Sequence, residues 1–216
     1  MKKFLKIIGI IFALLIIAAI ILNEVARSAD GPRQSIQFLN TSTEKRSVTF
    51  TEIMPDSTLD SLYTVNVILE AGDWIIREVP PRHYKVDVWD SHDKFIETQN
   101  FRLTLKNPEE SDYHLYYFDM ALDKDFMIVD LNGLYEKSVM SVNYRSGYSV
   151  AKVYDGAKPF QVSEEYTDRQ WLGLDTKLPN KVSWGAVVYG MFPVLKSAND
   201  EQRSQSLGDQ IHKRSE

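Results

Sequence analysis

The sequence predicts a mostly β-structured protein, an all-β sandwich ectodomain of one or two small sandwiches, that follows one apolar N-terminal segment. Short apolar runs recur about every 8–12 residues after residue 34, and several alternate apolar with polar positions. Gly, Pro, Asn and Asp residues separate these runs, and no four-turn helical stripe follows the N-terminal segment. Together these patterns favour short antiparallel strands connected by tight turns.

Residues 7–22, IIGIIFALLIIAAIIL, are predicted to form a transmembrane signal-anchor helix. Extended back to Phe4, the helix would be roughly 28 Å long at about 1.5 Å per residue, close to the thickness of a hydrocarbon core. Three lysines lie on its N-terminal side, whereas basic and acidic residues balance on the other side. Residues 1–6 are therefore expected in the cytoplasm and the rest of the chain outside it.

A cleaved signal peptide is the alternative interpretation of the same segment. Ala26-Arg27-Ser28 has small residues at the two positions that a signal peptidase reads, so cleavage would fall near Ser28. Residues 23–34 form a polar linker. The domain is thus expected on the inner (cytoplasmic) membrane as the extracytoplasmic part of a single-pass protein, or secreted or periplasmic after cleavage.

The composition limits the classes of function. The chain of 216 residues has a formal charge of −5, and the part after residue 29 has 21 basic and 29 acidic residues, a formal charge of −8. An acidic domain disfavours nucleic acid as a partner, because such binding depends on positive patches. The absence of cysteine excludes disulfides, thiolate metal sites and a cysteine nucleophile, and with the single-pass layout it favours a bacterial envelope.

The first predicted unit, residues 35–122, is a β-sandwich domain. The stretch 63–69 alternates between two sets of side chains, which is the period of a half-buried strand. Ala71-Gly72-Asp73 predicts a tight turn, and Pro80-Pro81 ends the next strand because proline donates no ladder hydrogen bond. The predicted strands are residues 35–39, 47–53, 63–69, 74–79, 84–88, 95–105 and 114–120.

Residues 123–195 are predicted to be a second β-rich part, either separate or a continuation of the same domain. Strands are expected at residues 126–131, 148–154 and 181–190, with irregular, aromatic-rich connections between the last two. Residues 196–216 are almost all polar, and we expect them to form a mobile tail.

Residues 65–98 resemble the small β-sandwich modules of the PEGA and carboxypeptidase-regulatory (transthyretin-like) type. The resemblance is carried by the Gly72 turn, by Val79-Pro80, and by the run Tyr84-Lys85-Val86-Asp87-Val88. In those modules a strand ends at a turn with proline and glycine, and the next begins Tyr-x-Val-x-Val. Here the turn after Val79 contains no glycine. The resemblance implies a non-catalytic module that spaces, anchors or binds.

Two clusters of polar side chains are candidates for chemistry. In the first, His92 lies in a loop with Asp90 and Asp93, and His83 is just upstream. Imidazole and carboxylate groups suit a hard or borderline metal ion. Asp, Ser and His are also ordinary residues of hairpin loops, and their spacing here matches no metal motif.

The second cluster is Asp119, Asp123, Asp125 and Asp130, where facing carboxylates could bind calcium or perform acid–base chemistry. The glycine-centred calcium loop is absent, and solvated turn carboxylates are the commoner arrangement. Sequence motifs for a serine nucleophile, a zinc peptidase or a phosphate-binding loop are also absent. We therefore assign no catalytic, cofactor-binding or metal-binding residue and expect no cofactor.

Several aromatic side chains could line a binding face. Trp89 falls on the polar face of its strand, and exposed aromatic residues are enriched at partner surfaces. Burial in the sandwich core is the alternative for each aromatic residue. The candidates are Tyr113, Tyr116, Tyr117, Phe118, Trp89, Trp171 and Trp184.

These observations predict a membrane-anchored extracytoplasmic protein that acts as a non-enzymatic interaction or assembly module of a bacterial envelope. Its expected partners are the membrane, through the N-terminal helix, and an envelope protein; no oligomeric state is predicted. One alternative is an exported hydrolase or metal-dependent enzyme that uses an Asp/His cluster. Another is a glycan- or lipid-binding module with Trp89 on a concave face.

Overall fold

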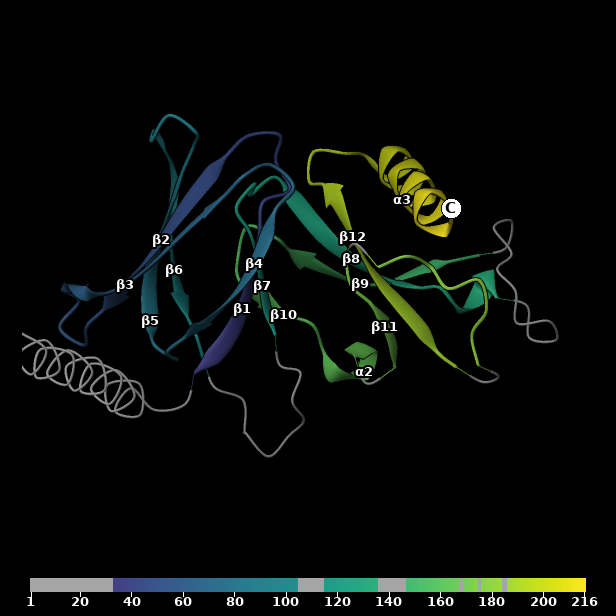
Figure 1. Ribbon diagram of the computed structural model, residues 1–216, viewed down its shortest axis with the longest axis horizontal. Coiled ribbons are helices and arrows are strands. Elements are labelled where there is room, and N and C mark those ends of the chain that lie inside the picture. The colour runs from purple at the N-terminus through teal and green to yellow at the C-terminus, as the bar shows by residue number, and fades with distance from the viewer. Residues whose placement is uncertain (1–32, 105–114, 136–146, 168, 175, 184–185) are drawn as a thin grey trace, which may run out of the picture.

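The computed structural model describes residues 33–104, 115–135, 147–167, 169–174, 176–183 and 186–216. The predicted β-rich class is confirmed, since most of the regular structure in these residues lies in three four-stranded sheets. In Figure 1 the sheets follow one another along the long axis of the molecule, and helix α3 (Asp200–Ser215) lies beside the third.

The first sheet consists of β2 (Arg46–Ile53), β3 (Leu59–Leu69), β5 (His83–Trp89) and β6 (Phe95–Arg102). It is antiparallel throughout, in the order β3-β2-β5-β6. Alternate residues of β2 point inward, so that Val48 and Phe50 are buried while Ser47 and Thr49 are partly exposed. This burial explains the two-residue period in the sequence.

The second sheet consists of β1 (Gln34–Leu39), β4 (Trp74–Val79), β7 (Tyr116–Asp119) and β10 (Phe160–Gln161). Its order is β10-β7-β1-β4; β1 and β7 are parallel and the other pairs are antiparallel. β10 comes from the predicted second part of the chain. The predicted boundary at residue 122 therefore does not separate the two parts into independent sheets.

The first and second sheets face each other across a shared apolar core. Phe38, Phe50 and Phe118 are fully buried, and their rings meet edge to face with centroids 5.3, 5.8 and 6.3 Å apart. Tyr84 joins them, and its hydroxyl donates to the carbonyl of Pro80 at 2.7 Å. The only polar atom of the Tyr84 side chain is thus hydrogen-bonded inside the core.

The third sheet consists of β8 (Lys124–Asp130), β9 (Ser149–Asp155), β11 (Gln170–Leu172) and β12 (Val188–Leu195), in the order β11-β12-β8-β9. One face packs on the second sheet, where Phe126 and Ile128 of β8 meet Tyr117 of β7 and Phe160 of β10. The other face is covered by α3. Two short elements, η1 (Asn132–Leu134) and α2 (Glu164–Thr167), lie in its connections.

The predicted strand at residues 181–190 is wrong over most of its length, because β12 begins at Val188 and continues to Leu195. It passes through Pro193, three residues after the predicted end at residue 190. β11 pairs with β12 only as far as Gly190, so at Pro193 one side of β12 has no partner strand among the described residues. Proline is tolerated at such an open position, since no ladder hydrogen bond is lost.

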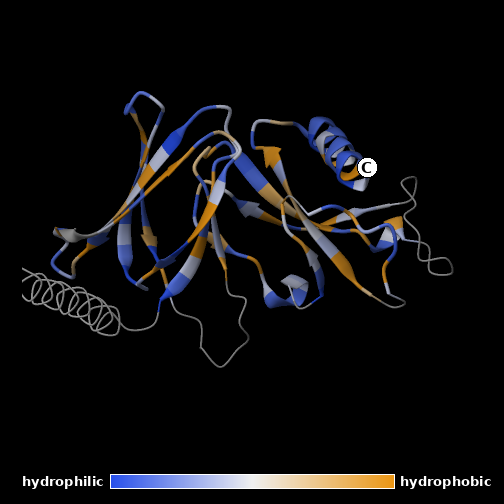
Figure 2. Ribbon diagram, in the orientation of Figure 1, coloured by the Kyte–Doolittle hydropathy of each residue, from blue (hydrophilic) through white to orange (hydrophobic). Residues whose placement is uncertain are grey.

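The expected mobile tail is wrong for residues 200–215, which form α3. The helix begins with a capping box: the Asn199 side chain accepts from the Gln202 N–H at 2.9 Å, and the Gln202 side chain accepts from the Asn199 N–H at 3.0 Å. Leu207 and Ile211, one turn apart, are buried against the third sheet. Most of the helix is hydrophilic, as Figure 2 shows, which is why its sequence suggested a solvated tail.

The predicted anchor at residues 7–22 lies outside the described residues, which begin at Arg33. Within the described ranges, no helix combines the length and apolar character needed to cross a membrane. The anchor and its orientation stay predictions from the sequence.

Candidate binding groove

The first predicted polar cluster forms the turn between β5 and β6. Asp90 accepts hydrogen bonds from the backbone N–H groups of Lys94 and His92 at 2.9 and 2.8 Å, and these bonds lower the pKa of its carboxyl below the ordinary value. The His92 side chain is exposed, and Asp93 adopts a positive φ of 57°. His83 is exposed at the opposite end of β5. The loop is thus a hairpin turn held by Asp90.

Asp119, from the second predicted cluster, is fully buried at the end of β7. Its carboxylate accepts hydrogen bonds from the N–H groups of Thr41 and Ala121, each at 3.1 Å, and from the Thr41 hydroxyl. Burial raises the pKa of Asp119 above its ordinary value, and the hydrogen bonds oppose that shift. Asp119 therefore fixes the loop after β1 to the turn between β7 and β8.

The other three aspartates of this cluster lie apart. Asp123 is exposed in the turn before β8, whereas Asp125 forms an ion pair with Arg203 of α3, with 3.2 Å between Oδ2 and Nη2. Asp130, at the far end of β8, accepts from the Asn132 N–H at 2.8 Å. In the described part of the chain, no three histidine or acidic side chains come together in a way that could hold a metal ion.

The predicted aromatic face is divided between two cores. Tyr116 and Phe118 point into the core between the first and second sheets, whereas Tyr117 points toward the third sheet. Trp171 is partly buried in the core between the second and third sheets. Tyr113 and Trp184 lie outside the described residues.

Trp89 lies on the outward face of the first sheet but is partly covered. Its ring packs edge to face on Phe95, with centroids 5.4 Å apart. The strand registers place Ile68, Ser47, Trp89 and Phe95 in one row across the sheet. Three of these four side chains are apolar, they lie on an outward sheet face, and none of the four lines the groove between the second and third sheets.

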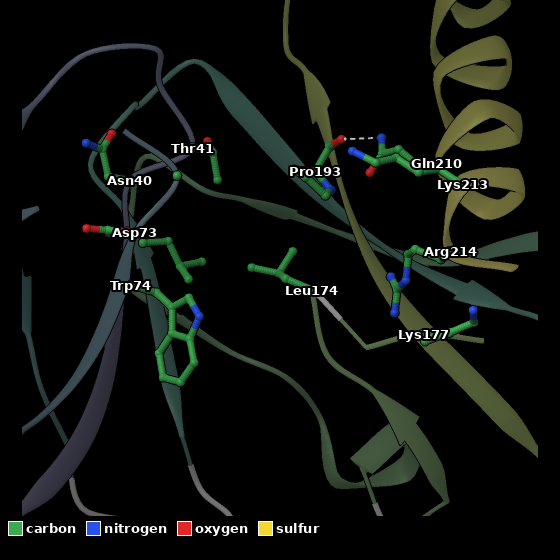
Figure 3. Close-up of a pocket in the computed structure, with 12 residues that line it drawn as sticks. Asn40, Thr41, Asp73, Trp74, Leu174, Lys177, Pro193, Gln210, Lys213 and Arg214 are labelled. Atoms are coloured by element: carbon green, nitrogen blue, oxygen red, sulfur yellow. Dashed lines mark hydrogen bonds between the residues drawn. The ribbon is translucent and has the colours of Figure 1, made fainter. Parts of the chain in front are cut away.

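A groove of about 480 Å³ lies between the second sheet and the wall formed by the third sheet and α3. Trp74 of β4 stands on one side and Leu174 on the other, with Pro193 of β12 above them in Figure 3. The described apolar side chains that join the two sheets come from β1, β7 and β10 on the second-sheet side, and none comes from β4. The groove therefore opens where the contact between the two sheets ends.

β4 forms one wall of the groove and is also an edge of the second sheet. Among the described strands it pairs with β1 alone. Ile75 and Val79 pack into the core with the first sheet, so Trp74 and Ile76 point to the opposite face, where they are 53% and 44% exposed. Two large apolar side chains therefore face solvent on a regular strand.

The opposite wall is basic. Lys177 and Lys213 are exposed there, and Arg214 lies between α3 and β12 (Figure 3). The Lys177 ammonium donates to the Glu216 carbonyl. The Arg214 guanidinium donates to the carbonyls of Thr176, Met191 and Gly173 at 2.8, 3.1 and 2.6 Å. It also lies over the Phe192 ring, with 4.5 Å from Cζ to the centroid. Arg214 thus fixes the last turn of α3 and the loop before Lys177.

The rim of the groove is fixed by Asn40, whose side chain is buried. Its Nδ2 donates to the carbonyls of Glu44, Leu69 and Glu70 at 2.8 to 3.0 Å. The Gly72 N–H donates to the Asn40 carbonyl at 2.8 Å, and Gly72 has a φ of +81°, a conformation that favours glycine. The turn that leads into β4 is therefore held firmly beside the groove.

Sequence reasoning did not find this groove. Trp74, Leu174 and Lys213 come from segments far apart in the chain, and no local spacing relates them. One signal was present: Trp74, Ile75 and Ile76 are three consecutive apolar residues in a strand, so at least one must point away from the core.

The groove combines an apolar space, a basic wall and a strand edge that is open among the described strands. Its lining residues contain three basic side chains and one acidic side chain, Asp73, although the domain as a whole is acidic. This arrangement suits an elongated ligand that carries both apolar and anionic groups. Comparison with protein-family models, curated proteins and solved structures gave no significant match to the chain.

Proposed function

We propose that the protein is a membrane-anchored, extracytoplasmic module of a bacterial envelope that binds a partner protein and catalyses no reaction. In this proposal residues 7–22 hold the chain on the membrane. The first two sheets act as a β-sandwich of the PEGA or carboxypeptidase-regulatory kind that residues 65–98 resemble. The groove beside Trp74 is the contact surface.

The exposed indole of Trp74 carries the proposal. Large aromatic side chains placed in a pocket on a rigid element provide much of the binding energy of protein interfaces. Trp74 is 53% exposed, and its strand is held by regular pairing with β1 and by the Gly72 turn. A partner side chain that entered between Trp74 and Leu174 would cover apolar surface that water now contacts.

One further observation and one physical argument support a binding role. The candidate carboxylates Asp90, Asp119, Asp125 and Asp130 each accept hydrogen bonds from different neighbours, which supports structural roles for them. A membrane anchor would also restrict the domain to one surface and raise its effective concentration for partners there.

A matched pair of isoleucine substitutions tests the contact surface. Ile76→Lys places a charge on the exposed face of β4, and Ile68→Lys does so on the outward face of the first sheet, where Ile68 is 62% exposed. We expect Ile76→Lys in the full-length chain to abolish complementation of a deletion strain, with unchanged protein abundance and melting temperature. Ile68→Lys should complement normally.

The same strains test the partner and the location. A photo-crosslinking residue at position 174 should give a protein adduct in intact cells, and the adduct should disappear in the Ile76→Lys background. Protease added to spheroplasts should digest the domain while the N-terminus stays protected. Full complementation by Ile76→Lys, together with no adduct at position 174, would contradict the proposed contact surface.

A further inference from the structure

The sheet edges of the molecule differ in how open they are to another strand. The outer strands β10 and β11 contain only two and three residues, and short edges resist pairing with a new strand. The pairings of β3, β6 and β9 each contain a register shift, which also disrupts an edge. β4 pairs with β1 over six residues without a shift. β4 is therefore the most regular edge among the described strands.

The hydrogen bonds at the start of β4 show which of its peptide groups face outward. The Asn40 N–H donates to the Asp73 carbonyl at 3.0 Å, and the Leu39 carbonyl accepts from Met120 on the other side, so the peptide groups of Asn40 and Asp73, not those of Leu39 and Trp74, face across the two strands. Such pairs alternate along an antiparallel ladder, and the register then assigns Ile75, Arg77 and Val79 to bonding with β1. The peptide groups of Trp74, Ile76 and Glu78 consequently point away from the sheet.

The same alternate residues thus offer two kinds of contact. Trp74 and Ile76 present their side chains to the groove face and their N–H and C=O groups to the open edge. A strand added beside β4 would pair with these peptide groups, and every second side chain of that strand would face the groove side. Lys213 stands on the opposite wall beside Lys177, whose ammonium already donates to the Glu216 carbonyl, so acidic side chains opposite Lys213 would be favoured.

We propose that the groove binds an extended acidic segment of a partner protein, which adds to the second sheet as a strand beside β4. An apolar side chain of that segment lies between Trp74 and Leu174, and its flanking carboxylates face the basic wall at Lys213. This inference rests on the proposed function and specifies the conformation and charge of the partner segment.

Fluorescein-labelled seven-residue peptides test the inference by anisotropy with the full-length chain in nanodiscs. The probe has the sequence Thr-Glu-Thr-Leu-Thr-Glu-Thr. In an extended strand its two glutamates and its leucine therefore lie on one face. A control peptide has lysine in place of both glutamates. We expect the acidic probe to bind at least about tenfold more tightly than the lysine peptide, with an affinity that falls as salt is added.

Two variants and two modified peptides define the mode of binding. Lys213→Glu should weaken the acidic probe about tenfold, whereas the matched change Lys152→Glu on β9 should leave it unchanged. N-methylation of alternate peptide amides on one edge of the probe should abolish binding, and N-methylation of the other edge should not.

Equal binding of both N-methylated peptides would overturn strand addition, and equal binding of acidic and lysine peptides would overturn the charge preference. Free glutamate that competed as well as the probe would identify a small-molecule site and overturn the inference. So would self-association that Ile76→Lys removed, because it would place a second copy of the chain at this edge. None of these peptide results decides the proposed function, which is tested independently by complementation and crosslinking in cells.

Discussion

On the face of the second sheet that meets the first sheet, apolar side chains of β1, β4 and β7 all enter the shared core, whereas β4 contributes no apolar side chain to the contact with the third sheet. On the side of the shared core, Phe38, Val79 and Phe118 are each 0% exposed. On the other side, Leu39 and Tyr117 are buried, but Trp74 and Ile76 of β4 face solvent. One sheet thus buries one face in a core and leaves part of the other exposed, and the proposed function assigns the exposed part to partner contact.

The difference arises from what covers each strand. The first sheet packs on the inward-facing apolar residues of β1, β4 and β7, so these side chains contribute to folding stability. The third sheet packs on the second sheet through β8, which contacts β7 and β10, and α3 covers the other face of the third sheet. We therefore expect substitutions to separate into those that change stability and those that change binding.

Phe118→Ala should have the largest effect on stability. Its ring is fully buried against Phe38 and Phe50, and removing such a side chain typically costs about 3–5 kcal/mol of the free energy of unfolding. Urea denaturation followed by circular dichroism measures this loss. A change within about 0.5 kcal/mol would contradict the closed core that the comparison requires.

Leu207→Ala should come next, with a loss of about 2–4 kcal/mol. Leu207 is one of two buried apolar residues of α3, and the same helix carries Lys213 and Arg214 into the groove wall. Hydrogen exchange should show faster exchange of the α3 amides in the variant. Gln205→Ala, at an exposed position of the same helix, serves as the control and should exchange as the wild type does.

Asp119→Asn should cost about 1–3 kcal/mol, because the Thr41 hydroxyl loses its carboxylate acceptor at the corner between the two faces. The loss should depend on pH. The folded-state pKa of Asp119 lies above the ordinary 3.8, so the folded protein binds this proton more tightly than the unfolded chain does.

The contribution of Asp119 to stability is therefore greatest below the unfolded pKa and falls as pH rises through the folded pKa. Asparagine does not titrate, so the difference between wild type and variant should be larger near about pH 4 than near about pH 7. Denaturation curves of both proteins at the two pH values measure it. A difference that grew with pH would show that the pKa shift has the opposite sign.

Trp74→Ala should have the smallest effect on stability, less than about 1 kcal/mol, because half of the indole already contacts water. The same variant should lose binding of the acidic probe. This pairing of unchanged stability with lost binding is the reverse of the result expected for core substitutions. A large loss of stability would instead assign Trp74 to the core. The exposed β4 part of this sheet face would then not differ from the buried part over β1, β7 and β10.

The strand pattern could be predicted from the sequence wherever one face of a strand is buried. The alternation around Val48 and Phe50, and around Val86 and Val88, arises from the core between the first two sheets, so local periodicity contains the information. Helix α3 was missed because only Leu207 and Ile211 are buried against the sheet. The polar capping box at Asn199 was the signal that could have revealed it.

The groove could not be predicted, because it depends on pairings between distant segments. Trp74 and Leu174 lie on separate segments and line one groove because the third sheet packs against the second. The acidic cluster shows that, conversely, residues close in sequence need not meet in the structure. Asp119 and Asp130 are close in sequence, but they lie at the ends of different strands and contact different loops.

The two-residue strand β10 also affects the order in which the molecule can be completed. Phe160 and Gln161 pair with β7, which would otherwise be an outer strand of the second sheet. Because the chain is synthesised from the N-terminus, the edge of β7 that pairs with β10 would stay unpaired until residue 161 had been added. Until then a chaperone could bind this unpaired strand edge, or two incomplete chains could pair through it.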